Sequence, residues 1–190
     1  MELVFLALAA SVGVASFVLG RALGRALKKG AARPALPAPV DRTPLTLQVG
    51  DIVEHLDRDY LVEGALLLSE SPRAARLCRL IDGATERFLF ASTHAPSETW
   101  LLAVVDPAPE AQAEELLHAG ERLRLERRWK AAALSAGRIG RRSFEAELTV
   151  FEYLSGTGCF MLVLQGATRS TAFYGERLLP HAIEILPGRG

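Results

Sequence analysis

The first 29 residues constrain this chain more than any other segment. No charged residue occurs from Leu3 to Leu19, and four basic residues follow, namely Arg21, Arg25, Lys28 and Lys29. As a helix, the uncharged run would rise about 25 Å at ~1.5 Å per residue, whereas a bilayer core of about 30 Å needs about 20 residues. Neighbouring apolar residues supply the difference. The pattern therefore predicts a transmembrane helix followed by a basic juxtamembrane stretch.

The order of charges around this run favours an anchor that is not cleaved. A signal peptide carries its positive charge before the apolar run, but here Glu2 precedes the run and the cations follow it. A signal peptide and an interfacial helix are the two alternatives. Cytoplasmic flanks carry the excess of Lys and Arg. We therefore expect a single-pass protein of the inner or plasma membrane, with its N-terminus outside and its C-terminal domain cytoplasmic.

Residues 30–44 contain four prolines, which favour an extended and semi-rigid linker. Residues 45–190 are enough for one domain with a hydrophobic core.

The formal net charge of the whole chain is zero, but the charges are unevenly distributed. Residues 1–33 hold five cations and one anion, so the rest of the chain carries a net charge of −4. Nucleic-acid binding needs a basic face, so we expect no nucleic-acid partner. The two cysteines, Cys78 and Cys159, are predicted to be buried, unreactive thiols.

Alternating apolar and polar residues separated by short turns predict a mainly β domain. The clearest examples are the hairpin pattern over 76–91, around Asp82-Gly83, and the alternating stretch over 144–154. Short connections favour an antiparallel sheet, curled or closed into a barrel. A weak similarity between 80–89 and 154–161 suggests two related β halves. The only helix expected in this domain lies between Pro107 and Gly120.

The chain contains no recognisable catalytic or metal-binding motif. HExxH, CxxC, GxSxG and phosphate-binding loops are absent from the sequence. The four histidines are predicted to lie on the surface or in loops, and Gly137–Arg142 reads as a solvated basic turn that could also cradle an anion. Glu145 and Glu147 fit an exposed strand face, whereas Glu152 falls on the opposite face. We therefore expect no enzyme activity, catalytic residue, cofactor or metal.

Several short segments follow one another along the chain, namely Val49-Gly50-Asp51, Tyr60 to Gly64, Glu86 to Leu89, Trp100-Leu101, Phe151-Glu152-Tyr153, Cys159 to Leu162 and Phe173 to Arg177. Taken in order, they resemble family 4178 of domains of unknown function, a bacterial group. The similarity covers about residues 45–188, and the chain departs from it at Leu77-Cys78, where the family often has Glu-Tyr. It implies a β-rich fold without an assigned activity, in domains that accompany membrane proteins and polyamine-type enzymes of membrane-stress systems.

These observations predict a membrane-tethered cytoplasmic β domain that binds another membrane-associated protein as an adaptor. Its contact surface is expected near Glu63, Tyr153 and Tyr174, because tyrosine is favoured at interfaces. One alternative is a small-molecule-binding or enzymatic domain, which would need a polar cavity lined by Glu152 and a histidine. Another is a peripheral lipid sensor, in which the basic flank binds anionic lipid of the inner leaflet.

Overall fold

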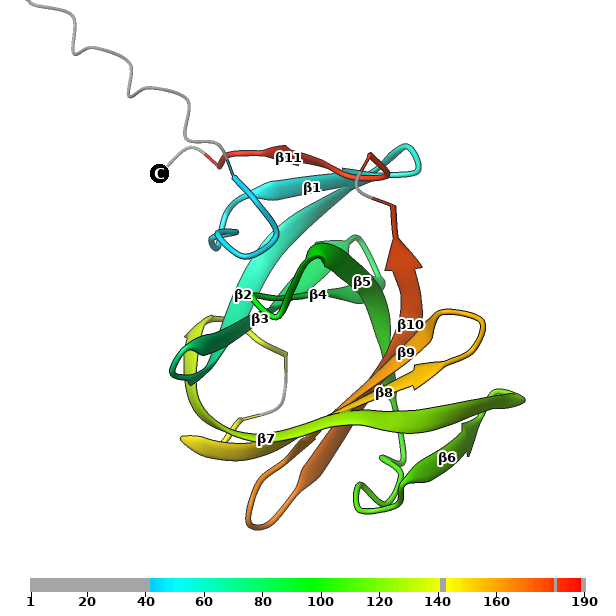
Figure 1. Cartoon of the computed structure of the whole chain (residues 1–190). Helices are drawn as coiled ribbons and strands as arrows, with labels where there is room; N and C mark the ends of the chain where they lie inside the picture. Colours follow the sequence, from blue (N-terminus) through cyan, green and yellow to red (C-terminus); the bar gives the residue numbers. More distant parts are fainter. Residues whose placement is uncertain (1–41, 141–142, 180, 189–190) are drawn as a thin grey trace, which may run out of the picture. The chain divides into compact units, whose positions relative to one another are not determined.

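The computed structural model describes residues 42–140, 143–179 and 181–188 (Figure 1). Within these residues every regular element is a β-strand, and no helix is long and apolar enough to cross a bilayer. The anchor predicted over residues 1–29, with its basic flank, lies outside the described residues, as does most of the linker. These features therefore stay predictions. A compact unit spanning 41–190 encloses the predicted domain.

Eleven strands make up the described part of the chain. Most are bounded by turns of two to four residues, as expected for antiparallel neighbours. In chain order they are β1 (Ile52–His55), β2 (Arg58–Glu70), β3 (Arg73–Asp82), β4 (Thr85–Ser92), β5 (Ala95–Val105), β6 (Glu115–His118), β7 (Glu121–Gly137), β8 (Glu147–Ser155), β9 (Cys159–Gln165), β10 (Ser170–Leu178) and β11 (Glu184–Leu186).

Eight of these strands close into an antiparallel barrel in the order β2-β3-β4-β5-β10-β9-β8-β7 (Figure 1). Closure comes from pairing between β2 and β7, which runs from Gly64 opposite Gly137 to Ser69 opposite Ala132. Strands β1 and β11 extend the sheet beyond β2, and β6 extends it beyond β7. The predicted antiparallel β fold is confirmed, and pairing of β2 with β7 closes the barrel, so that only the short strands β11 and β6 remain at the ends of the sheet within the described residues.

The barrel consists of two four-stranded meanders, β2 to β5 and β7 to β10. They meet first strand to first strand through β2 and β7, and last strand to last strand through β5 and β10. The predicted hairpin around Asp82-Gly83 is confirmed as β3–β4, with Asp82 opposite Thr85. The similar segment near residue 154 forms the β8–β9 hairpin, on the opposite side of the barrel. A common origin of the two halves stays a prediction.

Apolar side chains fill the interior of the barrel. At its centre the Trp100 ring stacks on Phe160 with centroids 4.5 Å apart, and Phe90 stacks on Phe160 at 5.5 Å. Every barrel strand contributes to this core. Its buried members are Leu66, Leu68, Ala75, Leu77, Phe88, Phe90, Trp100, Leu102, Trp129, Ala131, Ile139, Leu148, Val150, Phe160, Leu162, Leu164 and Phe173.

Two further cores lie on the outer face of the barrel, where alternate residues of the same strands point outward. The first meander is covered by the flap, which we define as β1 and β11, and the residues beneath it include Cys78 and Leu80. The second meander is covered by the segment that precedes β6. There Ala111 is buried, and the Tyr153 hydroxyl donates to the Ala111 carbonyl oxygen at 2.9 Å.

The predicted helix between Pro107 and Gly120 is wrong. The segment is irregular up to β6, and a turn with positive φ at Ala119 (51°) and Gly120 (83°) returns the chain into β7. Two interactions from distant residues explain the difference. The Tyr153 hydroxyl binds backbone carbonyls of this segment, and β7 offers its backbone to β6 for pairing. A helix with a thin apolar face has no comparable burial to compete with them.

Candidate binding site at the barrel mouth

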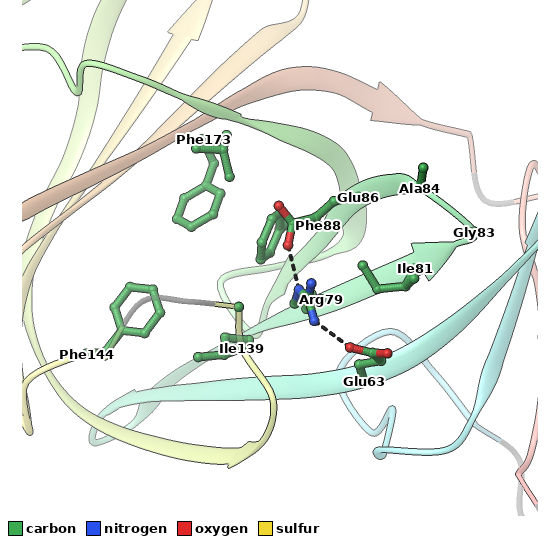
Figure 2. Close-up of a pocket in the computed structure, with 12 residues that line it drawn as sticks. Glu63, Arg79, Ile81, Gly83, Ala84, Glu86, Phe88, Ile139, Phe144 and Phe173 are labelled. Atoms are coloured by element: carbon green, nitrogen blue, oxygen red, sulfur yellow. Dashed lines mark hydrogen bonds and ion pairs between the residues drawn. The ribbon is translucent and has the colours of Figure 1, made fainter.

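Three charged side chains gather at one end of the barrel, supplied by three neighbouring strands. A β-bulge between Val62 and Gly64 interrupts the pairing of β2 with β3 at Glu63. Arg79 follows Leu77 by two residues on β3, so it shares the inward face. Glu86 enters from the start of β4. Figure 2 shows the guanidinium of Arg79 between the two carboxylates.

Arg79 bridges the two glutamates. Its Nη1 lies 2.5 Å from Oε2 of Glu63, and its Nε lies 2.5 Å from Oε1 of Glu86. The Arg79 side chain is 17% exposed, against 32% for Glu63 and 40% for Glu86. One cation between two anions leaves a formal charge of −1 at this position. In each pair only one carboxylate oxygen binds Arg79, so the second oxygen can accept a hydrogen bond from another group.

An open cavity of about 550 Å³ adjoins this triad. Phe144 and Phe173 lie across the cavity from the triad, and Phe88 lies beside Arg79, with which it pairs across β3 and β4; Ile81 and Ile139 add aliphatic surface (Figure 2). Ligand sites are commonly cavities of a few hundred Å³, and this one combines charged and apolar side chains in its lining. We call this cavity and its charged triad the mouth.

The segment that follows β7 forms one side of the mouth by crossing very close to the bulge of β2. The Arg138 amide donates to the Glu63 carbonyl oxygen at 2.8 Å, and Ile139 is only 7% exposed. A Cβ on Gly64 would overlap the Arg138 carbonyl group, so only glycine permits this approach. The prediction of a solvated turn at Gly137–Arg142 is therefore wrong at Ile139, which enters the core.

The family model of a domain of unknown function (DUF4178) matches residues 48–180, which is more than half of the chain. The chain belongs to the DUF4178 family. This finding confirms the family expected from the sequence, and the match includes all three charged residues of the mouth. No curated protein and no solved structure matches the chain.

The contact residues predicted from the sequence do not come together in this DUF4178 domain. Glu63 lies at the mouth, but Tyr153 is completely buried, and burial raises its pKa. Tyr174 is half-buried on the outer face, where its ring meets His118 edge-on at 4.6 Å. A hydrogen bond with Cys159, followed by burial, raises the pKa of Tyr174 to about 12. Tyr153 cannot contribute to a contact surface, because its hydroxyl is used inside the fold.

Three other residues singled out in the sequence, Glu145, Glu147 and His55, do not line the cavity of the mouth. Glu145 accepts bonds from the amides of Ala167 and Thr168, and these bonds lower its pKa. Glu147 is exposed, as expected. His55 is buried and bonds to the Ala182 carbonyl oxygen at 2.7 Å, so the prediction of a surface histidine is wrong for it. Among the described residues no group of three or more His, Cys, Asp or Glu side chains could hold a metal ion.

Sequence reasoning missed two of the three charged residues of the mouth, Arg79 and Glu86. A signal for Arg79 existed, because it occupies an inward position of an alternating strand between Leu77 and Ile81. A charged residue among inward apolar residues requires a partner or an opening to solvent. The partner of Arg79 comes from another strand, and this pairing depends on the register of β2 and β3.

Proposed function

We propose that this DUF4178 protein is a membrane-tethered binding module, which recognises another membrane-associated protein through the mouth of its barrel. The observation that carries this proposal is the Glu63–Arg79–Glu86 bridge, which lies beside an open cavity at one end of a barrel whose centre is filled by apolar side chains. The predicted anchor at residues 1–29 would hold this module at the cytoplasmic face of the inner or plasma membrane.

The chemistry of the mouth favours a cationic side chain as the group that it binds. The triad carries a formal charge of −1, and aromatic side chains line the cavity beside it. Lys and Arg combine a cation with an apolar stem, so they match both surfaces. An incoming cation would bind the free carboxylate oxygens beside Arg79. The charges of the triad already neutralise each other in part, which suits reversible binding.

A membrane tether strengthens this kind of contact without enlarging it. Two proteins confined to the same bilayer meet at a high effective concentration, so a weak pairwise affinity is sufficient. The basic residues Arg21, Arg25, Lys28 and Lys29 would contribute attraction to anionic lipid of about 1 kcal/mol each. The expected role is therefore that of an adaptor, and the mouth supplies its specificity.

In-cell crosslinking followed by pull-down tests this proposal. We would compare the full chain, a chain that lacks residues 1–30, and the full-length variant Glu63→Gln/Glu86→Gln. Glu110→Gln/Glu126→Gln is the matched control, because it removes two exposed carboxylates away from the mouth. We expect a stoichiometric partner with the full chain and the control, and little of it with the other two. Equal recovery with the mouth variant would exclude the mouth as the recognition site.

A second candidate function is the binding of a small organic cation. The cavity volume of about 550 Å³ favours it, because small-molecule sites commonly measure about 300–1,000 Å³. Thermal-shift screening of amines against the full chain would test it. A ligand that raises the melting temperature of the wild type, but not of Glu63→Gln/Glu86→Gln, would support this candidate. If no amine stabilises the protein and a protein partner depends on the mouth, the adaptor function is favoured over the binding of a small cation.

A further inference from the structure

A row of aliphatic side chains leads from the flap to the mouth. In the observed register Leu186 lies opposite Ile52, Ile52 opposite Leu61, and Leu61 opposite Ile81. Residues directly opposite in antiparallel strands share a face, so the four side chains form one row across β11, β1, β2 and β3. Ile81 lines the mouth and pairs with Glu86. We call this the aliphatic row; it ends at the charged triad.

A row of carboxylates runs beside it, two residues further along each strand. Glu184 lies opposite Glu54, and Glu54 lies opposite Asp59. We call these three residues the acidic row. Like charges directly opposite each other destabilise a sheet, and among the described residues no ion pair involves any of the three. The folding of the flap therefore gives no reason for this concentration of negative charge.

Both rows lie on the face of the flap that points away from the core. The alternate residues Val53, Tyr60 and Ile185 pack into the core beneath the flap. Leu61 is 45% exposed and Leu186 is 41% exposed. Exposed leucines lie beside carboxylates that form no ion pair within the described residues, and the aliphatic row continues to the charged triad of the mouth. This surface is complementary to a polypeptide that carries apolar and basic side chains on adjoining faces.

We infer that the two rows dock a basic amphipathic helix of a partner protein. This inference rests on the proposed function and names the chemistry of the partner. Neighbouring strands are about 4.8 Å apart, close to the ~5.4 Å rise of one helical turn. A helix that crosses the strands would place one apolar residue per turn on the aliphatic row and Lys or Arg on the acidic row. Its next cation along would reach Glu86 and Glu63.

Fluorescence anisotropy with a labelled Leu/Lys peptide of about 15 residues, long enough to form a helix, tests this inference. The full chain is placed in phosphatidylcholine nanodiscs, and empty nanodiscs correct for lipid binding. We expect Glu54→Lys/Glu184→Lys to weaken peptide binding about tenfold, because two favourable surface charge pairs with the peptide are replaced by repulsive ones. The control Glu110→Lys/Glu126→Lys, with the same change in net charge, should alter binding less than about twofold.

A charge swap makes the test sharper. Glu54→Lys/Asp59→Lys/Glu184→Lys should lose the Leu/Lys peptide and gain a Leu/Glu peptide of the same pattern. Equal effects of the flap and control variants would overturn the inference, as would equal binding of both peptides by the wild type. Self-association of the wild type that the flap substitutions abolish would also overturn it, in favour of a second copy as the occupant.

Thermal melting separates a binding effect from unfolding. Lys at position 54 would lie between Asp59 and Glu184, so Glu54→Lys should raise the melting temperature by about 2–4 °C. A lower melting temperature would contradict the repulsion on which the inference depends. The proposed function can fail separately: specific peptide binding at the flap without any mouth-dependent partner in cells would exclude the mouth as the recognition site and leave the flap surface standing.

Discussion

Each half of the barrel contains an arginine–glutamate pair beside a bulge in its first strand, but the two pairs have different surroundings. In the first half Arg79 joins Glu63 and Glu86 next to an open cavity. In the second half Arg127 Nη1 lies 2.9 Å from Oε2 of Glu152, near the bulge of β7. The same pair of residue types can therefore be compared in an open and a closed setting within one molecule.

The closed pair is completed by a third side chain. Trp129 Nε1 donates to the remaining oxygen of Glu152 at 2.9 Å, and the Glu152 side chain is only 7% exposed. The glutamates of the open pair are 32% and 40% exposed, and each binds Arg79 through one oxygen. A buried carboxylate whose oxygens are both bonded supports the fold. A carboxylate with an available oxygen beside a cavity can bind a ligand, and this difference supports the proposal that the first half is the one that binds a partner.

The largest effect is expected from opening the closed pair. Glu152→Leu leaves Arg127 without its carboxylate and the Trp129 N–H without an acceptor, so we expect a loss of about 3 kcal/mol in unfolding free energy. Urea denaturation measures it. The double variant Arg127→Leu/Glu152→Leu should be less destabilised than the single one, because it also removes the guanidinium of Arg127, which is 28% exposed and has lost its carboxylate in the single variant. A single variant as stable as the wild type would show that the pair is not structural.

The next effect concerns the close backbone crossing that forms one side of the mouth. In Gly64→Ala the new Cβ would overlap the Arg138 carbonyl, and relieving this overlap should cost about 2 kcal/mol. Gly156→Ala is the matched control, because no atom lies within 4 Å of the position that its Cβ would take, and it should change stability by less than about 0.5 kcal/mol. Similar melting temperatures for both variants would contradict the close approach of the Arg138 backbone to Gly64.

Much of the local structure was predictable, because local patterns determine it. The β3–β4 hairpin follows from its alternation and Gly turn, and alternation placed Glu152 on the face that proves to be inward. Closure of the barrel was harder to predict from the sequence, because β2 and β7 pair through small and aliphatic residues that are more than 60 positions apart. The triad depends on the same kind of information: it exists only once β2, β3 and β4 are in register.

A smaller effect is expected at the open pair. Glu63→Gln and Glu86→Gln should each lower the unfolding free energy by about 0.5 kcal/mol, because partly exposed ion pairs contribute little. The measurement is urea denaturation beside Glu126→Gln, an exposed carboxylate without an ion pair among the described residues. A loss as large as that of Glu152→Leu would make the open pair structural too, and the comparison between the two halves would fail.

The smallest effect on stability, and the most informative about the flap, concerns the two cysteines. Cys78 in the first half is completely buried beneath the flap, and burial raises its pKa to about 12. Cys159 in the second half is partly exposed, so the prediction of two buried thiols holds for Cys78 alone. At pH 8 iodoacetamide should modify Cys159 first, because the thiolate is the reactive form, and modification should leave the melting temperature unchanged.

Reaction at Cys78 would then report opening of the flap. The thiol is neutral in the folded protein, whereas in the unfolded chain it ionises with its ordinary pKa of 9.0. Stability should therefore fall as the pH rises from about 9 towards 12, because the unfolded state loses the proton first. Cys78→Ser should reduce this fall, with Cys159→Ser as the matched control. Equal alkylation rates of both cysteines at pH 8 would mean that the flap opens freely, and a surface built on its outer face could not then hold a partner in a fixed register with the mouth.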